Sequence, residues 1–138
     1  MTLKLHPQLQ TGCYILGQMQ DSVLLLHKNA LIPWFILVPD TREVELYKMP
    51  TAQQSRVNSS ISLLAHFVEE HFKTDKLNIA TIGNIVPQLH VHIIGRHKND
   101  FCWPRPVWEQ AESTDYTDAD VQSLKQLLLD KNLINQII

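Results

Sequence analysis

Short apolar runs separated by turn residues organise the first part of the chain. Ser22–His27 contains Val-Leu-Leu-Leu, which predicts a strand. Trp34–Val38 is apolar at every position and predicts a second strand that is covered on both faces. Pro39 and Asp40 end this run, and Cys13–Leu16 gives a weaker strand signal. The pattern therefore predicts two clear strands and a weaker one before them.

Two later segments have helical spacing instead. Thr51 followed by Gln54 matches a capping box, which predicts a helix start. Apolar residues then recur every three or four positions, at Val57, Ile61, Leu64, Val68 and Phe72. We therefore expect an amphipathic helix over Ala52–Phe72. Thr117 with Asp120 resembles a second helix start, which Val121, Leu124 and Leu128 continue.

Two further strands are predicted between these helices. Lys76–Ile82 and Gln88–Ile94 have strand character, and the turn residues Gly83–Pro87 join them. The aromatic-rich segment Gly95–Asp115 is expected to be an extended loop. This order is typical of an α+β fold with an antiparallel sheet of about five strands, one long helix and a C-terminal helix. We expect a single domain over residues 1–138, in which residues 116–138 form a helical extension.

Composition narrows the class of protein. The chain has 138 residues, 44% of them apolar, which is enough for one ordinary core. Its 12 basic and 14 acidic residues give a net charge of -2 without clusters, which indicates no nucleic-acid or membrane partner. The run Trp34–Val38 is far shorter than a membrane span, and the N-terminal residues contain no signal-peptide core. Two cysteines form neither a disulfide framework nor a zinc set, so we expect a cytoplasmic protein.

The segment Gly83–Arg96 carries the candidate chemistry. Side chains alternate between the two faces of a strand, so Leu89, Val91 and Ile93 should enter the core. Gln88, His90 and His92 should then share the opposite face. Two strand rises separate the imidazoles by about 7 Å, a distance that can bracket one phosphate group. The pattern predicts a phosphate site on this face of the sheet.

Histidine suits nucleophilic attack on phosphorus. Its ordinary pKa of about 6.5 leaves a neutral ring nitrogen available at neutral pH. The phosphoimidazolium that forms is reactive, so one difficult displacement becomes two easier ones. The second histidine can supply a proton or a hydrogen bond, and backbone N–H groups around Gly83 can hold phosphate oxygens.

A His-x-His pair is not specific to nucleophilic catalysis. The two side chains can be ordinary surface residues, or they can bind a metal ion, which usually needs three or four ligands. His97 and Cys102 are the nearest further donors, but His97 has the opposite strand parity to His90. Arg96 is expected to be a solvated surface cation, with contact to a distal phosphate as the alternative. We expect no bound metal.

Five separated segments together resemble one family. They are His-Pro-Gln-Leu at 6–9, Ile-Pro-Trp-Phe-Ile-Leu-Val-Pro at 32–39, Asp-Lys-Leu-Asn at 75–78, Gly-Asn-Ile-Val-Pro-Gln-Leu-His at 83–90 and Trp-Pro-Arg-Pro-Val-Trp at 103–108. This combination resembles the histidine triad (HIT) superfamily, in particular small proteobacterial proteins related to diadenosine polyphosphate hydrolases. The resemblance implies a HIT-like fold.

The resemblance also implies residue roles. His90 matches the nucleophile that forms a nucleotidyl-histidine intermediate, and His92 matches the histidine that contacts the phosphate and the leaving group. Substrate contacts are implied for Asn84 and Asn78 near the phosphates, Gly83 beside them, Asn29 at the ribose hydroxyls, and Leu26 and Trp34 near the base. Gln88 replaces the first histidine of the triad, and Ile85 replaces a common Ser or Thr. Glutamine can still hold the geometry of the site, but it does not titrate.

The function implied is hydrolysis or transfer of a nucleotidyl group. A dinucleoside polyphosphate or a nucleoside phosphoramidate would be attacked at its α-phosphate and would release a nucleoside monophosphate. No cofactor is expected, and the family resemblance implies a homodimer. Two alternatives stay open, namely a nucleotide-binding or adaptor protein with weak catalysis and a metal-dependent His-x-His protein.

Overall fold

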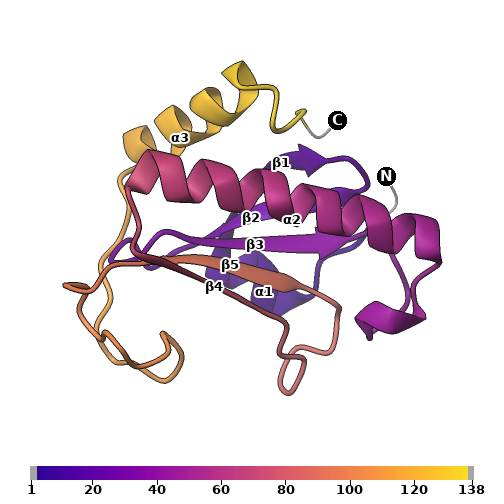
Figure 1. Cartoon of the computed structure of the whole chain (residues 1–138), viewed down its shortest axis with the longest axis horizontal. Coiled ribbons are helices and arrows are strands. Elements are labelled where there is room, and N and C mark those ends of the chain that lie inside the picture. The colour runs from indigo at the N-terminus through magenta and orange to yellow at the C-terminus, as the bar shows by residue number, and fades with distance from the viewer. Residues whose placement is uncertain (1–2, 137–138) are drawn as a thin grey trace.

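Five antiparallel strands form one sheet in the order β1-β2-β3-β5-β4 (Figure 1). The computed structural model describes residues 3–136. Its strands are β1 (Cys13–Met19), β2 (Ser22–His27), β3 (Trp34–Pro39), β4 (Lys76–Ala80) and β5 (Val91–Arg96). Neighbouring strands along the chain pair directly, except that β3 pairs with β5 and leaves β4 at the sheet edge. The predicted α+β fold with a five-stranded antiparallel sheet is confirmed.

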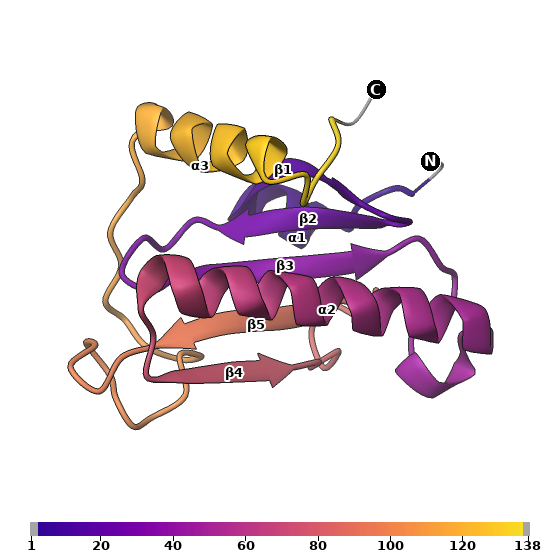
Figure 2. The same ribbon diagram turned by 45° about the horizontal axis from the view of Figure 1, so that its top comes forward.

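Helices cover the two faces of the sheet unequally. The long helix α2 (Thr51–Phe72) crosses one face, and α3 (Asp118–Asp130) lies beside it, as Figures 1 and 2 both show. The short helix α1 (Pro7–Gly12) lies behind the sheet, and a 3-10 turn, Leu46–Lys48, precedes α2. Among residues 3–136, no helix is long and apolar enough to cross a membrane.

Side-chain alternation produces two apolar layers. On β3, Phe35 and Leu37 pack toward α2, where they meet Leu64. Ile36 on the same strand packs toward the other layer, together with Leu9 of α1. Every residue of β3 is buried, which confirms the prediction of a strand covered on both faces. The second layer is the one that contains the candidate site.

Several boundaries differ from the sequence prediction. The histidine strand begins at Val91 rather than Gln88, and β4 ends at Ala80 rather than Ile82. Val91 pairs with Leu37, and the pairing of β3 with β5 stops there, although β3 continues to Pro39. The segment that contains Gln88 and His90 is therefore irregular.

The N-terminal ends of two helices also differ from the sequence prediction. Helix α1 was missed, although Pro7 occupies its first turn and His6 Nδ1 accepts a hydrogen bond from the Gln8 backbone N–H at 3.1 Å. The expected capping box of α2 is absent, because the cap position is Pro50 and makes no side-chain hydrogen bond. Gln54 Nε2 instead donates to the Met49 carbonyl oxygen at 2.8 Å.

The C-terminal segment closes the fold on β1. After α3 the chain returns so that Gln18 and Asn135 exchange backbone hydrogen bonds of 2.8 and 2.9 Å. A Cβ atom at Gly17 would lie 2.7 Å from the Asn135 carbonyl oxygen, so this approach requires glycine. Leu128 of α3 and Ile134 join the same apolar layer as α2.

Candidate active site

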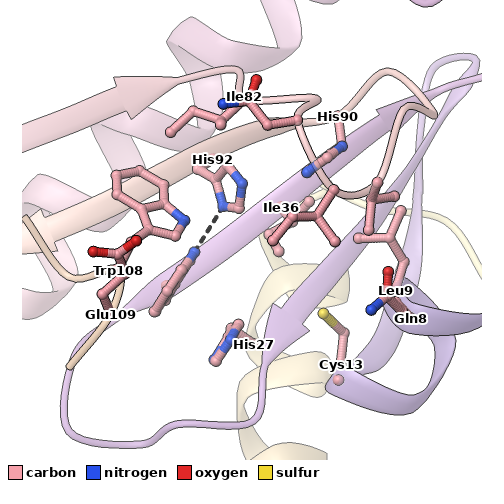
Figure 3. A pocket seen from close by; sticks show the side chains of 15 residues that line it. Gln8, Leu9, Cys13, His27, Ile36, Ile82, His90, His92, Trp108 and Glu109 are labelled. Atoms are coloured by element: carbon pink, nitrogen blue, oxygen red, sulfur yellow. Dashed lines mark hydrogen bonds between the residues drawn. The ribbon is translucent and has the colours of Figure 1, made fainter. Parts of the chain in front are cut away.

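A cavity of about 520 Å³ opens on the sheet face opposite α2. Its lining comes from α1, β1, β2, β3, β5, the loop before β5 and the loop around Trp108. Figure 3 shows Gln8 and Leu9 on one side, Trp108 and Glu109 on the other, and His27, Cys13, His90 and His92 between them. The apolar walls and the few converging polar groups are typical of a small-molecule site.

Within the described residues, His90 forms a hydrogen bond through Nδ1 and none through Nε2. The residue is 4% exposed, and its Nδ1 lies 2.6 Å from the Gln88 carbonyl oxygen. A carbonyl oxygen can only accept, so the ring hydrogen is on Nδ1 in this contact. In the neutral ring, Nε2 then carries the lone pair. His90 is therefore held in the tautomer that a nucleophile needs.

His92 has the opposite arrangement. The indole Nε1–H of Trp34 donates to His92 Nδ1 at 2.9 Å, shown as the dashed line in Figure 3. An indole nitrogen can only donate, so the hydrogen of the neutral His92 ring is on Nε2. Burial, together with the nearby His90 and His27, lowers the pKa of His92 to about 3. His92 is thus a neutral hydrogen-bond donor and not a cationic acid at neutral pH.

The two rings lie closer together than strand spacing predicts. Their centroids are 5.0 Å apart and the ring planes are inclined by 69°. The expected value of about 7 Å assumes that both residues belong to an extended strand, whereas His90 precedes β5. A lone pair on one ring and an N–H on the other can face the same phosphoryl group. The arrangement is suited to attack by His90 and charge stabilisation by His92.

Trp34 supports the histidines instead of offering both faces to a base. Its ring stacks on His27 with centroids 3.9 Å apart and planes 6° from parallel. The Trp108 ring meets it edge-on at 5.8 Å. Trp34 lines the cavity as a residue near the base would, but it is only 5% exposed and one face is covered by His27. Trp34 is positioned to fix the His92 ring.

His27 is a site residue that the sequence analysis missed. Its Nδ1 accepts the Asn29 backbone N–H at 3.1 Å, and burial lowers its pKa. It follows Leu25 by two positions on β2, and Leu25 belongs to the layer that contains the cavity. Side-chain alternation along β2 places His27 on the same face as Leu25, but nothing in the sequence indicated which face of β2 meets the site. Gln8, Leu9, Cys13, Ile36, Trp108 and Glu109 were missed for similar long-range reasons.

Two of the implied substrate residues lie elsewhere. Leu26 is fully buried and packs in the layer beneath α2, so it does not reach the cavity. Asn29 also lies outside the cavity lining. Its Oδ1 accepts from the backbone N–H groups of Leu31 and Thr114 at 3.1 and 3.3 Å, and its Nδ2 donates to the Glu112 carbonyl oxygen. The Asn29 side chain therefore links the turn between β2 and β3 to the segment around Glu112 and Thr114.

The turn Gly83–Pro87 contributes some, but not all, of the residues that were expected near the phosphate. Asn84 and Ile85 line the cavity mouth, and Ile85 is 80% exposed. Gly83 is exposed in the same loop but is not among the lining residues. Among the lining residues between Ile82 and Val86, Asn84 is the one with a polar side chain.

Asn78 and Arg96 form a buried cluster outside the cavity. Arg96 is 1% exposed and donates to Asp100 at 2.8 and 3.1 Å. It also donates to Asn78 Oδ1 at 3.0 Å and lies 5.5 Å from the Trp103 ring centroid. Arg96 is therefore neither a solvated surface cation nor a contact for a distal phosphate, and both expectations are wrong. The side-chain oxygen of Asn78 binds Arg96 instead of a substrate phosphate. The cluster anchors the loop that carries Trp108.

Gln88 does not share a face with the two histidines. Its Oε1 accepts the His6 backbone N–H at 2.7 Å, and its Nε2 donates to the Lys4 carbonyl oxygen at 3.0 Å. The residue is outside the cavity lining, because the segment before Val91 is not an extended strand. Leu89, Val91 and Ile93 do enter the core as predicted. Within the described residues, no three His, Cys, Asp or Glu side chains are grouped so that they could hold a metal ion.

Comparisons with known proteins show the family to which the chain belongs. A family model described as the HIT domain matches residues 8–99. A histidine triad protein from Bradyrhizobium japonicum is 39% identical, with a TM-score of 0.88, and the match covers 93% of this chain and 96% of that one. A histidine triad protein from Marinobacter aquaeolei is 37% identical, with a TM-score of 0.87 and 95% coverage of both chains. A third, from Sinorhizobium meliloti, is 27% identical, with a TM-score of 0.88, and covers 94% of this chain and 96% of that one. The chain therefore belongs to the HIT domain family.

Proposed function

We propose that this protein is a nucleotidyl hydrolase or transferase in which His90 attacks the α-phosphate of a nucleotide. The observation that carries the proposal is the complementary pair of tautomers in one cavity. His90 Nδ1 is engaged by a carbonyl oxygen, and His92 Nδ1 is engaged by an indole N–H. The nucleophilic nitrogen and the hydrogen-bond donor are therefore set before a substrate binds.

The first step transfers the nucleotidyl group to the protein. The lone pair of His90 Nε2 forms a bond to the α-phosphorus, and the bond from phosphorus to the leaving group breaks with its electron pair. The His92 Nε2–H donates a hydrogen bond to a phosphoryl oxygen on which negative charge develops. In a phosphoramidate protonated at nitrogen, the amine leaves as a neutral molecule.

The second step regenerates His90. Water attacks the phosphorus, the bond from phosphorus to Nε2 breaks, and the electron pair returns to the imidazole. One proton of the water is released to solvent, and a nucleoside monophosphate is formed. The neutral state of His92 supports this step too, because a fixed N–H dipole stabilises the same oxygen without a change of protonation.

The charges of the cavity favour a phosphoramidate over a dinucleoside polyphosphate. The lining residues, all in the described part of the chain, include no lysine or arginine, and Glu109 supplies a carboxylate. A polyphosphate leaving group carries several negative charges that these residues do not neutralise. A single phosphoryl charge with a neutral or cationic leaving group fits better.

The test compares the two substrate classes directly. Purified protein is incubated with adenosine phosphoramidate or with diadenosine tetraphosphate, in buffer containing EDTA, and AMP is quantified. A His90→Asn variant serves as the control, because it keeps a polar side chain of similar size without a nucleophilic ring. We expect AMP from the wild type, faster from the phosphoramidate, and none from the variant.

Two other outcomes would point to the alternatives. Bound nucleotide without AMP release would favour a nucleotide-binding or adaptor protein. Activity that EDTA abolishes would favour a metal-dependent His-x-His enzyme and contradict the proposal. These arms separate the three hypotheses in one experiment.

We also propose that the chain forms a homodimer. Support comes from exposed apolar residues at an unpaired edge, where Ile79 of β4 is 48% exposed, and on α2, where Leu63 is 51% exposed. Sedimentation velocity tests this, because a species of one chain mass at micromolar concentration would contradict it.

A further inference from the structure

The Gln88 side chain joins the catalytic segment to the N-terminal segment. Its Oε1 accepts from the His6 backbone N–H at 2.7 Å, and its Nε2 donates to the Lys4 carbonyl oxygen at 3.0 Å. These partners lie more than eighty residues away along the chain. The contacts therefore connect Lys4 and His6 to the segment that precedes β5.

A carboxamide is well matched to this task. In an extended segment, the C=O of one residue and the N–H of the residue two positions later point to the same side. Gln88 presents an oxygen acceptor and an NH₂ donor from one planar group, as a neighbouring strand would. The side chain thus pairs with Lys4 and His6 in the manner of a short piece of sheet.

Residues 4–6, which Gln88 binds, directly precede helix α1, and α1 forms one wall of the cavity. His6 is the cap residue of α1, and its Nδ1 accepts from the Gln8 backbone N–H. Gln8, Leu9 and Gly12 of α1 then line the cavity. Displacement of residues 4–6 would move the start of this helix and so change the wall.

The main chain of Gln88 acts on the other side of the site. Its carbonyl oxygen lies 2.6 Å from His90 Nδ1 and sets the tautomer of that ring. One residue therefore holds the nucleophile through its backbone and the cavity wall through its side chain. We propose that Gln88 is a positioning residue that couples the His90 segment to the α1 wall, so that substrate affinity depends on its side-chain amide. The effect on substrate rests on the proposed function, whereas the tether itself does not.

The two halves of this role are separable by mutation. Any residue at position 88 keeps the carbonyl oxygen that His90 needs, so the turnover step should survive. Only the amide side chain tethers Lys4 and His6. Gln88→Ala should therefore raise KM by roughly tenfold, while kcat and its pH dependence stay within about twofold, since two hydrogen bonds are lost.

Histidine at this position provides a sharper test. Gln88→His would complete a run of three alternating histidines, and a catalytic role for position 88 would then raise kcat. A neutral imidazole has one donor and one acceptor on diverging ring nitrogens, so it cannot pair with both backbone groups as the planar amide does. We expect Gln88→His to resemble Gln88→Ala, with a higher KM and no gain in kcat.

The tether is also measurable without any substrate. Hydrogen exchange of the His6 backbone amide should accelerate when its acceptor is removed. Cys13 lines the same cavity as Leu9 and is 7% exposed. Loosening of α1 should therefore increase the rate at which Cys13 is alkylated, as followed by peptide mass to separate it from Cys102. We expect both rates to rise by roughly tenfold in Gln88→Ala and Gln88→His.

Gln10→Ala is the matched control, because Gln10 is exposed on α1 and does not line the cavity. It should leave KM, amide exchange and alkylation unchanged. Unchanged exchange and alkylation in both Gln88 variants would overturn the proposal, as would a fall in kcat with KM unaltered. If the wild-type protein turned over no nucleotide, the proposed function would fail, and the exchange and alkylation rates alone would decide whether the tether exists.

Discussion

The indole N–H of Trp34 donates to Nδ1 of His92 across 2.9 Å, and both side chains are almost completely buried. This bond places the hydrogen of the neutral His92 ring on Nε2. It also opposes protonation of His92, because a proton on Nδ1 would face the indole hydrogen. The bond therefore sets the tautomer of His92, while burial is the main cause of its lowered pKa and the nearby His90 and His27 add to it.

Removal of this bond should impair turnover more than binding. Trp34→Phe keeps an aromatic ring against His27 but loses the donor, so the His92 ring can adopt either tautomer. We expect kcat to fall by about 10- to 100-fold with little change in KM, because a phosphoryl contact made in the transition state is weakened. Steady-state kinetics gives the split, and ¹⁵N chemical shifts of the imidazoles report the tautomer. Trp103→Phe, which alters a ring over Arg96, is the control and should leave the His92 tautomer unchanged.

Stability should fall as the solution becomes acidic. The pKa of His92 is about 3 in the folded chain against 6.5 for the ordinary group, so only the unfolded chain takes up a proton as the pH falls between these values. His92 alone should therefore lower the free energy of unfolding below pH about 6.5, by up to roughly 1.4 kcal/mol per pH unit. Urea unfolding at several pH values measures this slope.

A His92→Gln variant should have a flatter profile, because glutamine can accept the indole N–H without titrating. The profile should not become level, since burial also lowers the pKa of His27. His66→Gln removes an exposed histidine and should leave the slope as it is in the wild type. If the free energy of unfolding changed equally with pH in His92→Gln and the wild type, the acid dependence could not come from His92.

Arg96 should contribute to stability and not to chemistry. Its ion pair with Asp100 is almost completely buried, with exposed side-chain fractions of 1% and 4%. Burial alone would raise the pKa of Asp100, but hydrogen bonds from Arg96 and from backbone N–H groups outweigh it and lower the pKa, so the pair is charged. Arg96→Met would leave the carboxylate uncompensated and should cost about 3–5 kcal/mol by urea unfolding.

Arg105→Met is the control for this experiment, because Arg105 is exposed in the same loop. It should change stability by less than about 0.5 kcal/mol. An Arg96→Met cost as small as that of Arg105→Met would mean that the cluster does not anchor the loop.

Glu109 should influence the choice of leaving group. Its carboxylate repels additional phosphates in a cavity whose described lining residues include no lysine or arginine. Glu109→Gln should raise kcat/KM for diadenosine tetraphosphate by about 3- to 10-fold relative to adenosine phosphoramidate, and added salt should reduce the difference. Glu112→Gln, an exposed change nearby, should leave the ratio of the two kcat/KM values unaltered.

The regular elements were predictable because their patterns are local. The apolar run of β3 and the helical period of α2 determine both the type and the approximate length of these elements. The start of β5 was not predictable in this way, because it depends on where the pairing with both neighbouring strands stops. Val91 pairs with Leu37, and His92 pairs with Ala80, the last residue of β4.

The site was predictable only in part for the same reason. The alternation of His90 and His92 indicated the face of the candidate site, but the partner of His92 lies 58 residues away on β3. The diagonal contact of Trp34 with His92 depends on the register between β3 and β5, which no local pattern contains. Leu26 points to the layer beneath α2, on the face of β2 opposite the cavity. Which face of β2 meets the cavity is set only when the whole sheet is assembled, so no local pattern indicated it.

The most direct test of the central claim is to capture the covalent intermediate. Protein mixed briefly with an adenosine phosphoramidate is quenched, digested and analysed by mass spectrometry for a nucleotidyl group on the peptide that contains His90. The account predicts one adenylyl group on His90, stable in alkali and labile in acid, and none in His90→Asn. AMP release by His90→Asn at the wild-type rate, or an adenylyl group on another residue, would contradict it.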